Sequence, residues 1–263
     1  MKASSMNIIA FALLFIACNE QTKETQFVMK KEMNLHHFNY RGAFMSGYYE
    51  GTFPLSAVVG NGDFGLGTFN NLDGEMVVLN GTIYRAKPDG SAEVVQDLSE
   101  NTPSAIVTYF RSEREVSFES LSTDSLKSWI AENLDTEKKM YALKVHGTFS
   151  ELTARSQEKV TERPFPPINK IVDDMIYHDL KDVQGTLVGF QLPPYLGNIN
   201  YPGLHFHFVS DTMNQKQNAG CAPRYVLKQG TLEIMEMTSF SVDIPTDAAY
   251  DKMKIIPEKT VSM

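Results

Sequence analysis

Gly203-Leu204-His205-Phe206-His207-Phe208-Val209 alternates apolar residues with histidines. This period of two predicts a β-strand with its apolar side chains on one face and His205 and His207 on the other. Two residues span roughly 6.5–7 Å of strand, so both imidazoles can reach one ion at about 2.0–2.1 Å. Two solvated histidines would give the same pattern. The strand therefore predicts either a metal site or ordinary surface histidines.

The chain of 263 residues is acidic, with a net charge of −8 and a pI near 5.3. Hydrophobic residues make up 42% of it, enough for one large core or two smaller ones. Such an acidic protein is not expected to have nucleic acid or an anionic membrane surface as its main partner.

The N-terminal region is expected to lie outside the folded part. Residues 8–17 form an apolar run that is too short to span a membrane and is typical of a signal peptide. Cys18 follows directly, as at the cleavage site of a bacterial lipoprotein; a plain secretory signal is the alternative. We therefore expect residues 1–17 to be removed and residues 18–37 to be a polar tether. The protein would be exported and anchored to a membrane only through a lipid on Cys18.

The cysteine count gives a second constraint. Cys18 and Cys221 are the only cysteines, and a lipidated Cys18 cannot form a disulfide. Cys221 is then a lone thiol in an exported protein. Such a thiol is expected to bond to another chain, to be buried, or to bind a metal.

Strand and helix signals alternate through the rest of the chain, which predicts a mixed α/β protein. Residues 64–69 and 76–79 flank an Asp73-Gly74 turn and predict a hairpin. The proline cluster at 164–167 predicts a boundary between a part spanning 38–163 and a part spanning 164–263 that carries the metal site. His36 and His37 are expected to be solvated, and Arg155 to lie in a polar connection. Further strands are expected over 141–149 and 185–192, a hairpin over 225–237, and helices over 121–133 and 168–178.

Several segments, in this order, resemble the alpha-acetolactate decarboxylase family. They are Gly62-Asp63-Phe64-Gly65-Leu66-Gly67-Thr68-Phe69-Asn70, Leu72-Asp73-Gly74-Glu75-Met76-Val77-Val78-Leu79, Pro164-Phe165-Pro166-Pro167, Gly185-Thr186-Leu187-Val188-Gly189-Phe190 and Pro202-Gly203-Leu204-His205-Phe206-His207-Phe208. The resemblance runs from about Tyr40 to the C-terminus. It implies an α/β (mixed α+β) fold of two packed parts, each built on a mixed β-sheet, and a homodimer. The implied reaction is zinc-dependent decarboxylation of the small molecule 2-acetolactate to acetoin and CO2.

The resemblance also implies a zinc ion held by three histidines, two of which match His205 and His207. Cys221, in Ala219-Gly220-Cys221-Ala222, falls where the third is expected. A thiolate binds zinc at about 2.3 Å, and two histidines with one cysteine is a known catalytic ligand set. We therefore expect Zn²⁺ on His205, His207 and Cys221, with Asp211 as the alternative third ligand.

Three charged residues match functional positions of the family: Glu75, Arg155 and Glu258. Arg155 is expected to hold the departing carboxylate or to donate to the developing oxyanion, and one of the two glutamates to deliver a proton. Each is otherwise a solvated surface charge. Two other functions compete with decarboxylation of 2-acetolactate. One is a catalytically silent, lipid-anchored homologue that binds a small hydroxy-keto acid or metal, and the other is a related lyase for another 2-hydroxy-3-keto acid.

Overall fold

The structure is a computed structural model that describes residues 33–211 and 217–256. Its strands are β1 (Asn34–Phe38), β2 (Phe53–Pro54), β3 (Phe64–Thr68), β4 (Glu75–Leu79), β5 (Thr82–Ala86), β6 (Ala92–Val94), β7 (Asn101–Thr102), β8 (Ser104–Thr108), β9 (Arg114–Ser122), β10 (Met140–Ser156), β11 (Ile176–Leu192), β12 (Gly203–Ser210), β13 (Ala219–Met237) and β14 (Ser239–Asp243). Its α-helices are α2 (Arg41–Met45), α3 (Leu55–Asn61), α4 (Thr123–Asn133) and α5 (Ala248–Lys252). In the described ranges, no helix combines the length and hydropathy needed to cross a membrane.

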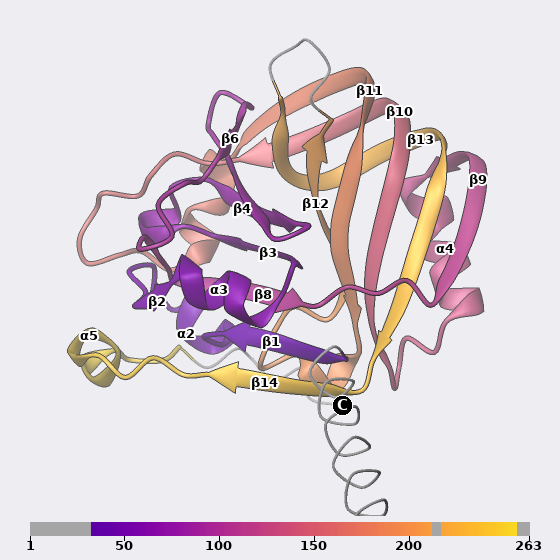
Figure 1. Ribbon diagram of the computed structural model, residues 1–263. Helices are drawn as coiled ribbons and strands as arrows, with labels where there is room; N and C mark the ends of the chain where they lie inside the picture. The colour runs from indigo at the N-terminus through magenta and orange to yellow at the C-terminus, as the bar shows by residue number, and fades with distance from the viewer. Residues whose placement is uncertain (1–32, 212–216, 257–263) are drawn as a thin grey trace, which may run out of the picture.

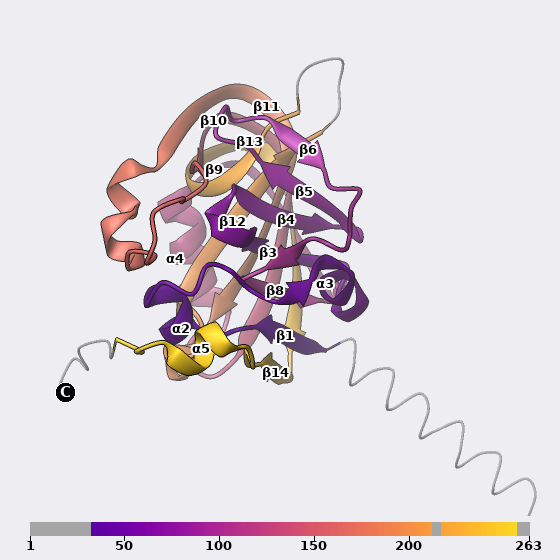
Figure 2. The ribbon, with the colours of Figure 1, turned by 90° about the vertical axis from the view of Figure 1, so that its left-hand side faces the viewer.

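Two β-sheets pack against each other, with the short strands on one side and the long strands on the other (Figures 1 and 2). One sheet has seven strands in the order β14-β1-β8-β3-β4-β5-β6, with β1 and β14 parallel. The other has five, in the order β10-β11-β12-β13-β9, all paired antiparallel. Because β10 also pairs with β13, four of these strands close into a ring. The predicted mixed α/β class is confirmed, but the expectation of a mixed sheet in each part is wrong, because only the seven-stranded sheet contains a parallel pair.

The predicted hairpin is present as β3 and β4, and it directs one acidic side chain between the sheets. Val77 belongs to the core between the sheets, whereas Met76 belongs to the core on the other face, beneath α3. Since side chains alternate along a strand, Glu75 shares the face of Val77 and points toward the five-stranded sheet. Gly65 lets β3 approach β8 closely, because a Cβ there would lie 2.1 Å from the carbonyl oxygen of Ile106.

The alternation in β12 is confirmed, and both of its faces are covered. Phe206 and Phe208 belong to the core that includes residues of α4, whereas Val209 belongs to the core between the sheets. His205 and His207 share the face of Val209 and therefore point toward the seven-stranded sheet. His207 is only 1% exposed, so it is not a surface histidine.

Several expectations about the length of elements are wrong. The strands β10 and β11 each have 17 residues and β13 has 19. Arg155 therefore lies within β10, and residues 225–237 belong to one continuous strand instead of a hairpin. Residues 168–178 form two short 3-10 turns and the start of β11 instead of a helix. Long neighbouring strands provide the backbone hydrogen bonds that these weakly patterned segments need.

The end of the expected tether is part of the fold. His36 and His37 lie in β1 between β8 and β14, with exposures of 9% and 5%, so they are not solvated. The sheets also do not divide at the proline cluster. β9, α4 and β10 precede it and belong with the later strands, while β14 joins the seven-stranded sheet. Residues 1–32, with the expected signal peptide and Cys18, lie outside the described ranges.

Candidate functional site

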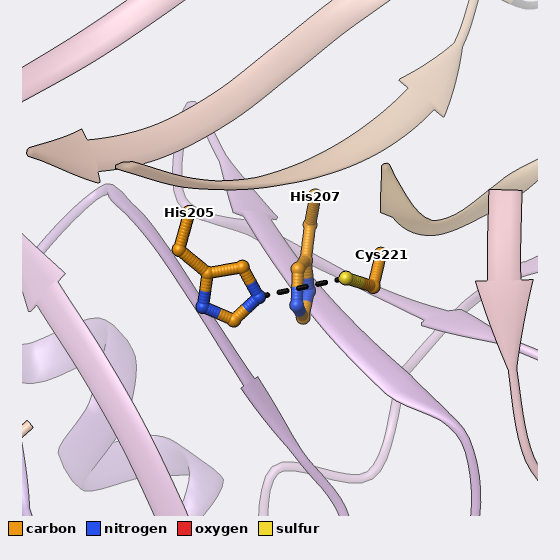
Figure 3. Close-up of side chains that lie close together, drawn as sticks. All are labelled: His205, His207 and Cys221. Carbon is orange, nitrogen blue, oxygen red and sulfur yellow. Dashed lines mark hydrogen bonds between the residues drawn. The ribbon is translucent and has the colours of Figure 1, made fainter. Parts of the chain in front are cut away.

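Three potential metal ligands face one another between the sheets: His205 and His207 from β12 and Cys221 from β13 (Figure 3). His207 and Cys221 are directly opposed across the two strands, which places their side chains on one face. The ligand atoms of all three residues lie within 4.8 Å of one another. Two imidazole nitrogens and one sulfur are donors that zinc prefers, and three protein ligands leave a fourth position for water or substrate. The donor set therefore fits a catalytic metal.

A hydrogen bond to the seven-stranded sheet orients the imidazole ring of His207. Its Nδ1 lies 2.8 Å from the carbonyl oxygen of Met76 in β4. Because a carbonyl oxygen only accepts, Nδ1 carries the proton and Nε2 keeps its lone pair for a metal. Hydrogen bonds of this kind fix the ring orientation of metal-binding histidines. The seven-stranded sheet thus orients a ligand that belongs to the other sheet.

The imidazoles are in the protonation state that a metal requires. Burial, together with the neighbouring His205, holds the pKa of His207 well below its usual value. Removal from water lowers the pKa of His205 to about 4, and the positive charge of Arg155 adds to this shift. Both rings are therefore neutral at pH 7, so no proton has to leave them when a metal binds.

Cys221 is a buried free cysteine with a contact to Arg155. Burial raises the pKa of the Cys221 thiol to about 12, although Arg155 opposes this rise. The sulfur lies 3.5 Å from Nε2 of His205 and 3.3 Å from Nη2 of Arg155. The alternative third ligand, Asp211, instead lies 3.1 Å from His146 and is not part of the donor cluster.

Glu75 and Arg155 adjoin the three potential ligands. Oε2 of Glu75 lies 3.7 Å from Nε2 of His207, and the Glu75 side chain is 12% exposed. Burial raises the pKa of Glu75 to about 7, although Arg155 partly opposes this shift. Arg155 lies directly opposite Cys221 across β10 and β13. Glu258, the third charged residue expected at the site, lies outside the described residues.

Four of these side chains, Glu75, Arg155, His205 and His207, line a cavity of about 540 Å³. Most pockets for small molecules are apolar, with a few polar groups that orient the ligand, and this cavity follows that pattern. Its apolar lining comes from α2, β3 and β8, from the segment that follows the proline cluster, and from the chain that leads into β12 together with the start of that strand. These residues include Phe44, Met45, Ile168, Val172, Met175, Ile199 and Leu204.

Gln157 also lines the cavity, and the sequence analysis missed it. It directly follows β10, is 4% exposed, and donates from Nε2 to the carbonyl oxygen of Leu72 at 3.2 Å. Its Oε1 is buried and has no hydrogen-bond partner among the described residues. Leaving a buried acceptor unpaired costs about 1–3 kcal/mol, which a ligand hydroxyl would offset. No local sequence pattern distinguishes Gln157 from a surface glutamine.

Comparisons with known proteins identify the family of this chain. The alpha-acetolactate decarboxylase family profile matches residues 35–256. The alpha-acetolactate decarboxylase of Klebsiella aerogenes is 30% identical over 224 residues, covering 85% of this chain and 84% of that protein. The one from Bacillus subtilis strain 168 is 31% identical over 209 residues, or 79% and 80%. A crystal structure of alpha-acetolactate decarboxylase from that strain superposes with a TM-score of 0.79 at 27% identity, covering 84% and 93%. The chain therefore belongs to the alpha-acetolactate decarboxylase family, whose named members are carboxy-lyases.

Proposed function

We propose that this protein decarboxylates 2-acetolactate to acetoin and CO2 in a zinc-dependent reaction. One observation supports the proposal above all: both histidines of the three-residue donor cluster, a buried carboxyl group and an arginine line the same cavity, and Cys221 contacts two of these side chains. The named relatives are alpha-acetolactate decarboxylases, which supports this choice of substrate. A protein that only bound a ligand would have no need for a carboxyl group with a pKa near neutrality beside the donor cluster.

The metal is assigned to His205, His207 and Cys221. When bound, zinc supplies a Lewis acid that stabilises negative charge developing on the substrate oxygens, by several kcal/mol. The two histidines contribute neutral donors and Cys221 a thiolate. The thiolate lowers the net charge of the centre by one relative to three histidines, and we expect it to weaken that Lewis acidity.

Arg155 binds the carboxylate that leaves as CO2. A guanidinium presents parallel N–H groups that match the two oxygens of a carboxylate. Nε of Arg155 is buried without a hydrogen-bond partner among the described residues, so this donor has no competing acceptor in the protein. By holding the carboxylate in one orientation, Arg155 aligns the breaking C–C bond with the π orbital of the neighbouring carbonyl group.

Glu75 supplies the proton that completes the reaction. Loss of CO2 leaves an electron pair on the substrate carbon, delocalised onto the neighbouring carbonyl oxygen as an enediolate. In the metal-free protein burial raises the pKa of Glu75 to about 7, which favours the protonated form that can deliver a proton to that carbon. Delivery from one side gives a single enantiomer of acetoin, and water then reprotonates the carboxylate. Glu258 is the alternative donor.

Acetoin formation tests this proposal. The purified folded domain, loaded with zinc, is expected to convert 2-acetolactate to acetoin and CO2; a chelator is expected to stop the reaction and added zinc to restore it. A rate no higher than the uncatalysed reaction contradicts the proposal. Calorimetric binding of intact 2-acetolactate without turnover would then identify the silent homologue. Turnover of a different 2-hydroxy-3-oxo acid alone would identify the related lyase.

We also propose that the protein is exported, lipidated on Cys18 and dimeric. The apolar run at 8–17 followed by Cys18 supports the first two points. Labelled fatty acid fed to expressing bacteria is expected to enter the wild-type chain but not Cys18→Ala, and light scattering on the soluble domain is expected to give the mass of a dimer. An unlabelled wild-type chain contradicts lipidation, and a monomer mass contradicts the dimer.

A further inference from the structure

Arg155 makes a contact with Cys221 that the proposed reaction does not itself require. The two residues are directly opposed on β10 and β13, so their side chains leave the sheet on the same face. Nη2 of Arg155 lies 3.3 Å from the sulfur of Cys221. On its other side Arg155 is directly opposed by Tyr177 of β11. Arg155 thus lies between two neighbouring strands, with its guanidinium beside the sulfur of Cys221.

The negative charge of a metal-bound thiolate explains what this contact can contribute. A histidine binds a metal in its neutral form, whereas a cysteine binds as the thiolate. A centre of two histidines and one cysteine therefore carries one more negative charge than a centre of three histidines. Cys221 is 4% exposed, so water does little to stabilise that charge. Hydrogen bonds to a charged sulfur are about twice as strong as those between neutral groups.

We propose that Arg155 is a positioning residue for the metal ligand Cys221, in addition to its role toward the substrate. It holds the sulfur in place and balances the negative charge of the thiolate when the metal binds. The inference rests on the proposed metal site and adds to it, because Arg155 and Cys221 then act as a pair. With a histidine at position 221, Arg155 has no ligand charge to balance.

A double-mutant cycle on zinc affinity isolates this pair. The four proteins are the wild type, Arg155→Met, Cys221→His and the double variant, and each is titrated with zinc against a chromophoric chelator. Arg155→Met has two effects: it removes a cation near the metal and it removes the partner of the sulfur. The first effect is common to both backgrounds, so the cycle cancels it. We expect the ratio of dissociation constants, variant over parent, to be about 10-fold higher in the cysteine background than in the histidine background.

Cobalt(II) provides a readout that does not depend on affinity. A thiolate bound to cobalt gives a sulfur-to-metal charge-transfer band, whose energy falls when a hydrogen bond to the sulfur is lost. The band is expected in the wild type and to shift to longer wavelength in Arg155→Met. Arg155→Lys retains a positive charge and a donor, so its band is expected to lie between the two. Arg41→Met is the matched control, because Arg41 lines the same cavity but donates to the Gly197 carbonyl oxygen, and its band is expected to stay unchanged.

The outcomes separate this inference from the proposed metal site. Equal ratios in the two backgrounds, or a band that does not move in folded Arg155→Met, contradict the role of Arg155 and leave Cys221 as a ligand. Absence of the band in the cobalt-loaded wild type removes Cys221 from the donor set, and with it this inference. Circular dichroism of each variant shows whether the fold is retained.

Discussion

The two sheets contribute to the site in different ways. The five-stranded sheet contributes His205, His207, Cys221 and Arg155, and Cys221 is directly opposed to both His207 and Arg155. The register of the strands within one sheet therefore determines the positions of these four side chains. The seven-stranded sheet contributes Glu75 and the carbonyl oxygen that orients His207, and only packing of one sheet on the other places them. The comparison separates metal binding, which depends mainly on the long strands, from proton transfer, which depends on the β3–β4 hairpin.

Removing the carboxyl group of Glu75 is expected to have the largest effect on turnover. Glu75→Gln keeps the shape of the side chain but leaves no proton to deliver, so kcat should fall by about 1,000-fold. Because this residue comes from the seven-stranded sheet, zinc content should stay at the wild-type level. Acetoin assays and metal analysis of the same preparation check both points. A wild-type rate would mean that another group, such as Glu258, is the proton donor.

Cys221→Ala is expected to lower zinc content, which Glu75→Gln leaves unchanged, since it removes a metal ligand from the five-stranded sheet. Removing a residue that hydrogen-bonds to a metal ligand costs about 10–100-fold in metal affinity. Loss of the ligand itself should cost at least as much. Cys221→His should retain zinc and, by restoring a neutral ligand, should raise kcat. Metal analysis after dialysis measures the first effect. One zinc per chain in Cys221→Ala, bound as tightly as in the wild type, would exclude Cys221 as a ligand.

Arg155→Lys distinguishes substrate orientation from charge. The ammonium keeps the positive charge beside Cys221 but loses the planar pair of N–H groups that matches a carboxylate. We expect kcat to fall by about 100-fold while zinc content is retained. Steady-state assays of zinc-loaded protein measure this. An unchanged kcat would show that the positive charge alone is sufficient.

The last expected effect is on stability and not on turnover, and it depends on pH. In the metal-free protein burial raises the pKa of Glu75 from 4.5 to about 7, so the folded protein keeps this proton to a higher pH than the unfolded chain. The contribution of Glu75 to the free energy of unfolding is therefore greatest below pH 4.5 and falls as the pH rises through 7, by about 3 kcal/mol. Denaturant unfolding of chelated wild type and Glu75→Gln across this range gives the difference. If the free energies of unfolding of the two proteins change with pH in the same way, Glu75 is solvated.

Local signals were sufficient for the parts of the site that depend on short stretches of chain. The alternation of residues 203–209 predicted the strand and the common face of His205 and His207. The Asp73-Gly74 turn predicted the hairpin whose second strand begins at Glu75. In both cases neighbouring residues carry the signal, although the connection between β3 and β4 spans residues 69–74 and includes a 3-10 turn over Asn70–Leu72.

The position of Arg155 depends on bulges that the sequence does not reveal. In the first half of β10 the odd-numbered Val145 and Phe149 belong to the core that includes α4, whereas further along the even-numbered Leu152 and Ala154 do. Irregular register with β13 between these segments accounts for the change of face, and it leaves Arg155 facing the site. A regular strand would have turned it away. The pairing of β1 with β14, about 200 residues apart, likewise has no local signal.

The most direct test of the central claim, that a cysteine replaces one histidine in the metal centre of a decarboxylase, is X-ray absorption at the zinc edge. The sample is protein that forms acetoin and contains one zinc per chain. We predict one sulfur neighbour at about 2.3 Å and nitrogen or oxygen neighbours at about 2.0–2.1 Å, with the sulfur absent in Cys221→His. A wild-type spectrum with only nitrogen and oxygen neighbours would contradict the account.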